Sequence, residues 1–550
     1  MQKNRKLTDW GINVLLLVSS SFLFALSQPG FLFPTGLPLF AYFIFIPLFL
    51  LVRRISFQTS FLWGGFYGML NYCIFSYWLW GFHPLAMYIV ALEYFCYYML
   101  TIPLLKAADI LFPRFSYIVQ WLIWVAYEYI KTLGFLGFSY GLVGYSQWKW
   151  TPIIQIASIF GVWGVSALVC FPSAWIAGAI KEHCTEPVRC WFSGFWAFAR
   201  HERVAAVLWC CCMIGSFIFG VAVQQSAHQE LSTARIALIQ PNSDPWVGGI
   251  EAYKKDLKTL KSLSQQAITE NPGLALVVWP ETAFIPRIAW HYQYREDREL
   301  FELVHELLTY VNEQSVPFLI GNDDAVRDLT NGESLDRADY NAALLFRPKE
   351  NVLPPNPERY RKMHLVPFTE HFPYRSIFPF VYDALIANDT HFWEKGTEPV
   401  VFSVNGLDFS VPICFEDTFG YITRRFARYG AKLLINMSND AWAKSTACQY
   451  QHLSMAVFRA VETRLPMVRA TASGQTAAIS PYGYITAMLP PFTEAFLCTD
   501  VPILQEQSQT LYTYWGDVLG IFITLLAVCI LIIGFVRAIL RKGKTHEKNR

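Results

Sequence analysis

The sequence contains few charged residues for its length. Of its 550 residues only 16% are Asp, Glu, Lys or Arg, whereas about 25% is usual for a soluble domain. Hydrophobic residues make up 54% and aromatic residues 17%, which is typical of a chain that crosses a membrane several times. The formal net charge is only +2, so the composition gives no indication of a nucleic-acid partner.

The sequence also lacks the cysteine pattern of a disulfide-stabilised protein, internal repeats and low-complexity segments. Eight of its twelve cysteines lie in or between the N-terminal apolar segments, and Cys529 lies in the C-terminal one. The other three, Cys414, Cys448 and Cys498, are an odd number, so at least one thiol is expected to be free. Cysteines and histidines nowhere have the spacing of zinc ligands, and the sequence predicts neither a metal site nor a cofactor.

Residues 1–225 form a series of apolar runs with short connections. A run of about 20 apolar residues crosses a bilayer as a helix, because a helix satisfies every backbone polar group within the segment. A further apolar run follows near the C-terminus, so about eight spans are expected. They are 10–27, 36–52, 57–80, 85–105, 116–133, 152–180, 203–224 and 517–540.

Lysine and arginine positions predict how these spans are oriented. The N-terminal MQKNRK, the tail RKGKTHEKNR and the connections after the second, fourth and sixth spans are basic. The connections QPGFLFPTG and GFHP contain neither residue, and the connection with Lys131 and Lys149 is a weak exception. Both termini are therefore expected inside, with residues 226–515 outside.

The prediction divides the chain into a transmembrane domain at 1–225, an α/β domain at 226–515, and a C-terminal helix with a basic tail at 516–550. The first span also resembles a signal peptide, because a basic start and an apolar stretch precede Ala25-Leu26-Ser27. The helices that follow favour an uncleaved anchor instead.

Residues 226–515 alternate between short β-rich runs and helical patterns, which indicates an α/β domain with layered sheets. Apolar residues at three- and four-residue spacing predict helices at 251–270 and 296–314, and a third helix is expected at 449–464. The expected strands are ARIALIQ, LALVVW, VPFLIG, NAALLF, PVVFSV, DFSVPIC, KLLIN, LPMVRA and TAAIS.

Three chemically useful side chains stand at the ends of such runs. Glu281 follows LALVVWP, Lys362 lies in RYRKMHLVPFTEHFP, and Cys414 ends DFSVPIC. A thiol at a strand-to-helix turn is open to substrate, and a helix N-terminus can lower its pKa. A carboxylate can remove the thiol proton and a lysine can stabilise a tetrahedral oxyanion, so the set fits acyl transfer through a thioester.

Each residue alone has an ordinary structural interpretation. A lone cysteine at a strand end is often core filling, and a glutamate after Trp-Pro is often a turn residue. Lys362 lies in a basic run with Arg359 and Arg361 that is typical of a solvated face. The order Glu, Lys, Cys in these contexts is more specific than any one of them.

The three segments resemble the Glu-Lys-Cys triad of the nitrilase superfamily, and the whole chain resembles the apolipoprotein N-acyltransferase family. The shared motifs are IALIQPN, WPET, KMHLVPFTEHFP, ICFED, NMSNDAW and RATASGQTAAISPYG, with GFSYGLVGYSQ before them. Phe415 stands where the family often has tyrosine, Ser139-Tyr140 replaces Pro-Trp, and Ala472-Ser473 replaces an asparagine-rich pair.

The resemblance implies an α-β-β-α sandwich in which Glu281 is the base, Cys414 the nucleophile and Lys362 the oxyanion stabiliser. It also implies that Glu370 and Glu416 are supporting carboxylates. The resemblance further implies substrate-binding positions at Trp246, Phe415, Asn439 and Trp442. Their ordinary alternatives are a turn at Asn439-Asp440 and core aromatic residues.

The implied reaction moves an acyl chain from a phospholipid, through a Cys414 thioester, to the α-amine of the diacylglyceryl-cysteine of a lipoprotein. The implied location is the bacterial inner membrane, with the catalytic domain periplasmic and both termini cytoplasmic. The apolar segment 371–386 is a candidate lid at the membrane surface. A membrane-tethered amidase or nitrilase and an inactive transporter or scaffold remain alternatives.

Overall fold

The computed structural model describes residues 2–82, 84–180, 188–225, 231–327, 337–387, 390–504 and 509–548. It divides into a helical unit, Met1–Ser226, Ser445–Ser454 and Trp515–Arg550, and an α/β unit, Ala227–Lys444 and Met455–Tyr514. The predicted boundary at residue 226, Lys181 in the basic connection, and Cys184 lie outside the described residues.

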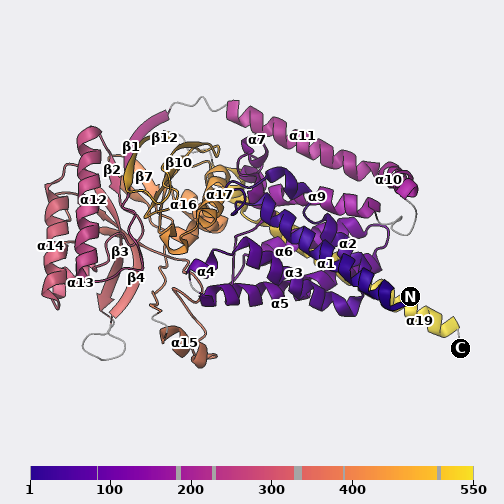
Figure 1. The fold of residues 1–550 in the computed structure, drawn as a ribbon. Coiled ribbons are helices and arrows are strands. Elements are labelled where there is room, and N and C mark those ends of the chain that lie inside the picture. Colours follow the sequence, from indigo (N-terminus) through magenta and orange to yellow (C-terminus); the bar gives the residue numbers. More distant parts are fainter. Residues whose placement is uncertain are drawn as a thin grey trace. The chain divides into compact units, whose positions relative to one another are not determined.

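Long helices make up most of the helical unit (Figure 1). The α-helices of this unit, among which α4, α7 and α8 have only four residues each, are α1 (Gln2–Ser27), α2 (Ile46–Arg54), α3 (Phe57–Phe75), α4 (Leu79–Phe82), α5 (Pro84–Leu111), α6 (Ser116–Ile130), α7 (Thr151–Ile154), α8 (Ala157–Phe160), α9 (Val162–Ile180), α10 (Val188–His201), α11 (Arg203–Gln225) and α19 (Val518–Lys548). Two 3-10 helices, η1 (Pro38–Tyr42) and η2 (Val143–Gln147), connect them.

Among the described residues, five helices are long and apolar enough to cross a membrane. They are Thr8–Ser27, Leu85–Leu111, Val162–Ile180, Arg203–Gln225 and Val518–Arg541. The other three predicted spans correspond to α2, α3 and α6, and the number of spans stays a prediction. The predicted span 36–52 is not one helix, because η1 precedes the nine-residue α2.

Two ionisable residues at the end of α6 hold a turn of the helical unit. Glu128 Oε1 accepts the backbone N–H of Val143 at 3.0 Å, and Lys131 Nζ donates to the carbonyl of Tyr140 at 2.9 Å. Both side chains are buried. Their contacts give them a structural role in this turn.

The α/β unit contains two six-stranded sheets, in the orders β12-β1-β2-β3-β4-β5 and β11-β10-β9-β8-β7-β6. The centre of each sheet is parallel, with β1, β2 and β3 in one and β7, β8 and β9 in the other. The strands are β1 (Leu231–Gln240), β2 (Leu276–Val278), β3 (Phe318–Arg327), β4 (Arg337–Phe346), β5 (Glu358–Arg361), β6 (Phe402–Val404), β7 (Leu407–Ser410), β8 (Leu433–Ser438), β9 (Met467–Thr471), β10 (Ala477–Ile479), β11 (Ile485–Met488) and β12 (Ala495–Leu504).

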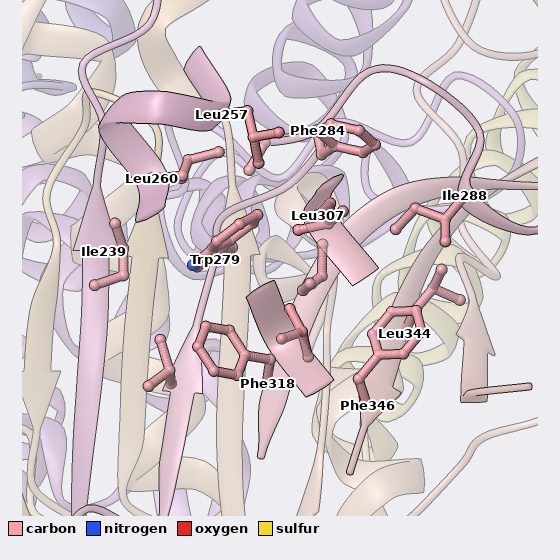
Figure 2. Packing of buried hydrophobic residues seen from close by; sticks show 14 of the residues in the cluster. Ile239, Leu257, Leu260, Trp279, Phe284, Ile288, Leu307, Phe318, Leu344 and Phe346 are labelled. Atoms are coloured by element: carbon pink, nitrogen blue, oxygen red, sulfur yellow. The ribbon is translucent and has the colours of Figure 1, made fainter. Parts of the chain in front are cut away.

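Helices α12 (Ile250–Glu270) and α14 (Arg298–Glu313) cover the outer face of the first sheet. Figure 2 shows Leu257 and Leu260 of α12 and Leu307 of α14 packed around Trp279 and Phe318. Fully burying each such leucine contributes about 1.5–3 kcal/mol relative to leaving it exposed. The predicted helical faces are therefore the faces that form this core.

Helices α16 (Gly420–Arg428) and α17 (Thr446–Thr463) belong to the second sheet's side, which completes the predicted α-β-β-α sandwich. The α/β unit also contains α13 (Ile288–Tyr294), α15 (Pro379–Ile386) and α18 (Leu511–Trp515). Helix α17 begins in the segment Ser445–Ser454, which belongs to the helical unit. There Gln451 donates to the carbonyls of Pro29 at 2.8 Å and Phe75 at 3.2 Å.

The sequence did not predict β5, β11 or β12, all of which lie near the edges of the sheets. Strand β12 pairs with the whole of β1, from Leu231 opposite Leu504 to Gln240 opposite Ala495. Strand β5 is the basic run whose composition is typical of a solvated face. Its Arg359 and Arg361 instead pair with the buried Asp324, which neutralises a carboxylate on β3.

Candidate active site

Strand ends bring the predicted catalytic side chains to one edge of the sandwich. Glu281 follows β2, and Lys362 directly follows β5. Strand β5 runs in the same direction as β2, because β3 is parallel to β2 and the two antiparallel pairings β3–β4 and β4–β5 reverse the direction twice. Cys414 follows β7, and Asn439 directly follows the parallel strand β8. Residues far apart in sequence therefore meet where these strands end.

Lys362 is fully buried and contacts two carboxylates. Its Nζ lies 3.2 Å from Glu281 Oε1 and 2.8 Å from Glu370 Oε1. Although burial opposes the charged form, Glu281 and Glu370 raise the pKa of Lys362 well above its usual range. Lys362 is therefore a fixed cation at neutral pH.

Glu281 is held by three donors from different elements. Besides Lys362, Asn341 Nδ2 donates to Oε1 at 2.8 Å, and the backbone N–H of Asn439 donates to Oε2 at 3.1 Å. The side chain is only 4% exposed. Donors on both oxygens fix the orientation of this carboxylate.

Cys414 begins the 3-10 helix η3 (Cys414–Thr418), with φ at 48° in the left-handed region. A non-glycine residue there is strained, and this conformation turns the partly exposed thiol away from the path of the preceding strand. The buried Asn436 supports the turn by donating to the carbonyls of Pro412 at 3.1 Å and Cys414 at 3.5 Å.

The expectation of a lowered thiol pKa is wrong. Burial and the charge of Glu281 raise the pKa of Cys414 well above its usual range, although Lys362 acts in the opposite direction. Cys414 begins the short 3-10 helix η3, and the next α-helix, α16, begins only at Gly420. The resting residue is a neutral thiol, so it needs a base.

The two glutamates predicted to be supporting residues occupy different positions. Glu370 touches Lys362 and also accepts the N–H of Val366 at 2.8 Å, and burial raises its pKa. Glu416 instead joins the chain after Lys362 to the turn before Cys414. It accepts from Tyr360 Oη at 2.8 Å and from the N–H groups of Met363, His364 and Ile413 at 2.7, 3.0 and 2.8 Å.

The four predicted substrate-binding residues divide into three groups. Asn439 contacts Glu281 through its backbone N–H, and its side chain accepts from Ala441 N as in a turn. Trp246 and Trp442 contact each other edge to face, with ring centroids 4.9 Å apart, and Trp246 is 49% exposed. Phe415 packs against Phe419 and His364.

Sequence reasoning missed several residues that contact the site. Asn341 is the first residue of the run NAALLF and donates to Glu281. A lone amide next to five apolar residues was the only sign in the sequence that this position has a polar partner. Arg469 interrupts the run LPMVRA and is fully buried between Asp417 and Asp440. A charged residue inside a buried strand needs partners, so its presence in the sequence was a usable signal.

Across the described ranges, no group of three or more His, Cys, Asp or Glu side chains could hold a metal ion. The chemistry available is that of the thiol, the carboxylates and the lysine. A carboxylate whose charge acts on a neutral thiol, beside a buried cation, can support nucleophilic attack on an acyl carbon.

Comparison with known proteins identifies the family. Residues 235–508 match the carbon-nitrogen hydrolase model, and residues 20–175 match the model of the apolipoprotein N-acyltransferase N-terminal domain. A solved structure of Saccharomyces cerevisiae Nit3, a member of branch 10 of the nitrilase superfamily, covers 52% of this chain and 95% of its own, with 19% identity and a TM-score of 0.35.

Relatives match almost the full chain. Apolipoprotein N-acyltransferase 1 of Treponema denticola is 49% identical over 532 residues, which are 95% of this chain and 96% of that relative. Apolipoprotein N-acyltransferase 1 of Treponema pallidum is 51% identical and covers 96% of both chains. This chain therefore belongs to the apolipoprotein N-acyltransferase family of membrane enzymes.

Proposed function

We propose that this enzyme takes an acyl chain from a phospholipid, holds it as a thioester on Cys414, and transfers it to the α-amine of a lipoprotein's N-terminal diacylglyceryl-cysteine. The observation that carries the proposal is the approach of Glu281 to Lys362 in the domain that carries Cys414. Membrane helices in the same chain suit substrates that are both lipids.

In the first half of the reaction, Cys414 Sγ attacks an ester carbonyl of the phospholipid and Glu281 accepts the thiol proton. Lys362 stabilises the negative charge on the carbonyl oxygen of the tetrahedral intermediate. The carbon–oxygen bond of the ester then breaks, and Glu281 returns the proton to the departing alkoxide. The products are a lysophospholipid and the acyl-enzyme thioester.

In the second half, the unprotonated α-amine attacks the thioester carbonyl and loses a proton to Glu281. The carbon–sulfur bond breaks, and the proton passes to the departing thiolate of Cys414. This returns the enzyme to the neutral thiol that burial favours at rest. The acceptor leaves with a third acyl chain joined by an amide bond.

Glu370 and Glu416 act in this scheme as supporting residues. Glu370 shares the Nζ of Lys362 with Glu281 and so fixes the direction in which the ammonium points. Glu416 holds together the segments that carry Lys362 and Cys414. In this scheme Trp246 and Trp442, which pair edge to face and are partly exposed, would line the acyl-chain entrance.

The segment 371–386 is proposed to act as a lid at the membrane surface. Helix α15 has no buried residue, and Ile377, Phe378 and Phe380 are 64%, 45% and 68% exposed. Apolar side chains exposed in this number indicate contact with a lipid surface. Excluding water there would protect the thioester from hydrolysis.

The orientation proposed for this reaction places the α/β unit in the periplasm and both termini in the cytoplasm. The basic N-terminus, the basic tail and the arginine-free connections on the other side support this arrangement. A lipoprotein acceptor anchored in the outer leaflet of the inner membrane would then lie on the same side as Cys414.

The test is intact mass spectrometry of the full chain in detergent after incubation with phospholipid and no acceptor. The parent chain is expected to gain one fatty-acyl mass, and a diacylglyceryl-cysteine peptide is expected to remove it and gain the same mass. Cys414→Ser should lose the labile thioester adduct. Cys498→Ser, a change at another partly exposed thiol of the same unit, should behave like the parent.

The outcomes separate the possible activities. An adduct that only water removes would favour a membrane-tethered hydrolase, which would use the same three side chains. Absence of any adduct with every phospholipid tried would contradict the proposed mechanism.

A further inference from the structure

We propose that Arg469 is a positioning residue that fixes Cys414 and Glu281 relative to each other. It does so by bridging two short segments at strand ends. One is the nucleophile turn, which is the 3-10 helix η3 (Cys414–Thr418), and the other is the Asn439 loop, which consists of Asn439 and the 3-10 helix η4 (Asp440–Ala443). The inference rests on the proposed function, because it concerns the approach of the thiol to its base.

Arg469 lies on β9 and is completely buried. Its guanidinium donates through Nη1 to Asp417 Oδ2, and through Nη2 to Asp440 Oδ2 at 3.4 Å. Asp417 is fully buried and Asp440 is 7% exposed. A planar guanidinium has donors in a fixed fork, so it can hold two carboxylates at a set separation.

Each carboxylate belongs to a different part of the site. Asp417 is in the same turn of η3 as Cys414, three residues after it. Asp440 follows Asn439, whose backbone N–H donates to Glu281 Oε2 at 3.1 Å. A continuous path therefore leads from the nucleophile through Asp417, Arg469 and Asp440 to the group that holds the base.

The position of β9 in the sheet explains why an arginine is placed there. Strand β9 pairs with β8, which leads into the Asn439 loop, and β8 pairs with β7, which leads into the nucleophile turn. Arg469 is opposite Asn436, whose side chain already supports the carbonyl of Cys414. The two residues support the turn from neighbouring strands.

Charge makes the bridge necessary as well as possible. Asp417 and Asp440 would be two buried carboxylates without Arg469, and removing one partner of a buried ion pair leaves an uncompensated charge. Gly474 adds a steric limit, because a Cβ there would lie 2.9 Å from Asp440 Oδ2. Asp440 of the Asn439 loop is thus held by its ion pair with Arg469 and by close packing against Gly474.

The experiment measures the rate at which iodoacetamide alkylates Cys414 in the full chain in detergent, because this reaction needs the thiol and its base but no lipid. Arg469→Lys keeps the charge but loses the fork. We expect alkylation at neutral pH to slow by about 10- to 100-fold, because misplacement of about 1 Å can cost on the order of 100-fold. The defect should shrink as the pH rises, since hydroxide then replaces Glu281 as the base.

Asp417→Asn provides a second variant that keeps the size of its side chain. Because Arg469 and Asp417 act through one bridge, the double variant should react no more slowly than the slower single variant. Arg464→Lys is the matched control, since Arg464 is another buried arginine of the same unit and contacts Pro481 and Tyr482 instead. Its alkylation rate should match that of the parent.

Two results would overturn the inference. One is Arg469→Lys alkylation at the parent's rate over the whole pH range. The other is multiplicative slowing in the double variant, which would mean that the two residues act separately. Either can occur while the parent still forms its acyl adduct, so failure of this inference is distinguishable from failure of the proposed function.

Discussion

At the scale of the residue, the site depends on carboxylates whose oxygens are already occupied by donors. Glu416 is fully buried and accepts from one hydroxyl and three backbone N–H groups. A backbone N–H cannot accept a hydrogen bond and an amide NH2 group cannot accept one either, so a glutamine of the same shape cannot satisfy all these partners. Glu416 therefore couples the Lys362 segment to the Cys414 turn through its acceptor capacity.

We expect Glu416→Gln to destabilise the chain by about 1–3 kcal/mol, because its amide N–H group would face donors and leave a buried polar group unsatisfied. Thermal unfolding in detergent measures the change. Glu350→Gln, at an exposed position, is the control and should leave the midpoint unchanged.

The cost of Glu416→Gln is expected to depend on pH. Burial raises the pKa of Glu416 to about 7 from its ordinary value of 4.5, so the protonated form is favoured in the folded state. The stability that this proton contributes is present below pH 4.5 and is lost as the pH rises through 7. The parent's advantage over Glu416→Gln should therefore narrow between pH 5 and pH 8, and a constant difference would contradict the assignment.

At the scale of the element, α15 stands out because none of its side chains is buried, so packing within the α/β unit gives no reason for its apolar residues. Its exposed apolar side chains gain nothing from contact with water, and a lipid surface would cover them. Because they support no core, replacing them should change how the enzyme meets its lipid substrate without changing its stability.

We expect the double change Ile377→Ser and Phe380→Ser to raise the phospholipid concentration needed for half-maximal acylation of Cys414 by several-fold. The unfolding midpoint and the iodoacetamide rate should stay the same. Tyr429→Ser is the control, since Tyr429 is 64% exposed elsewhere in the same unit. An equal effect of the double change and of Tyr429→Ser on phospholipid use would argue against a specific role for the segment 371–386, which contains Ile377 and α15.

Periodicity in the sequence predicted the helices that bury one face and whose buried residues recur every three or four positions. Leu257 and Leu260 at helical spacing identified α12, and the apolar run of β2 identified the strand that leads to Glu281. Strand β5 was missed because Arg359 and Arg361 bind Asp324 through tertiary contacts that the local sequence does not show. The turn at Cys414 was expected to begin an α-helix, and the 3-10 geometry depends on long-range support from Asn436.

The site shows the same division. The sequence motifs predicted that Glu281, Lys362 and Cys414 stand at the ends of strands, and in the structure Lys362 contacts Glu281. The hydrogen bonds from Asn341 and Asn439 to Glu281 could not be predicted, because they depend on how separate strands pair. Pairing across a sheet is fixed by the whole fold.

At the scale of the whole molecule, composition separated the membrane helices from the α/β region, because apolar runs and alternating patterns differ over hundreds of residues. It did not predict that 445–454 belongs to the helical unit. Nearly all of those residues lie in α17, which the sequence predicted as a helix of the α/β domain. Gln451 is recognisable as a partner of Pro29 and Phe75 only once the chain is folded.

The proposed orientation can be tested with a membrane-impermeant maleimide on spheroplasts. Tyr429→Cys, at an exposed position of the α/β unit, should react in intact spheroplasts beyond the background of the parent chain. Arg200→Cys, exposed at the end of α10, should react only after the membrane is permeabilised. The reverse pattern would place the α/β unit in the cytoplasm.

Each buried cation of the site is shared by two acids, Lys362 by Glu281 and Glu370 and Arg469 by Asp417 and Asp440. The resulting negative potential attracts an ammonium group and repels a phosphate. Under the proposed function, this potential would draw in a lipoprotein's free amine and would oppose entry of any phosphate-bearing headgroup, whether of the donor or of the lysolipid. We therefore expect a donor phospholipid to present its ester carbonyl to Cys414 while its phosphate stays away from the acid pairs.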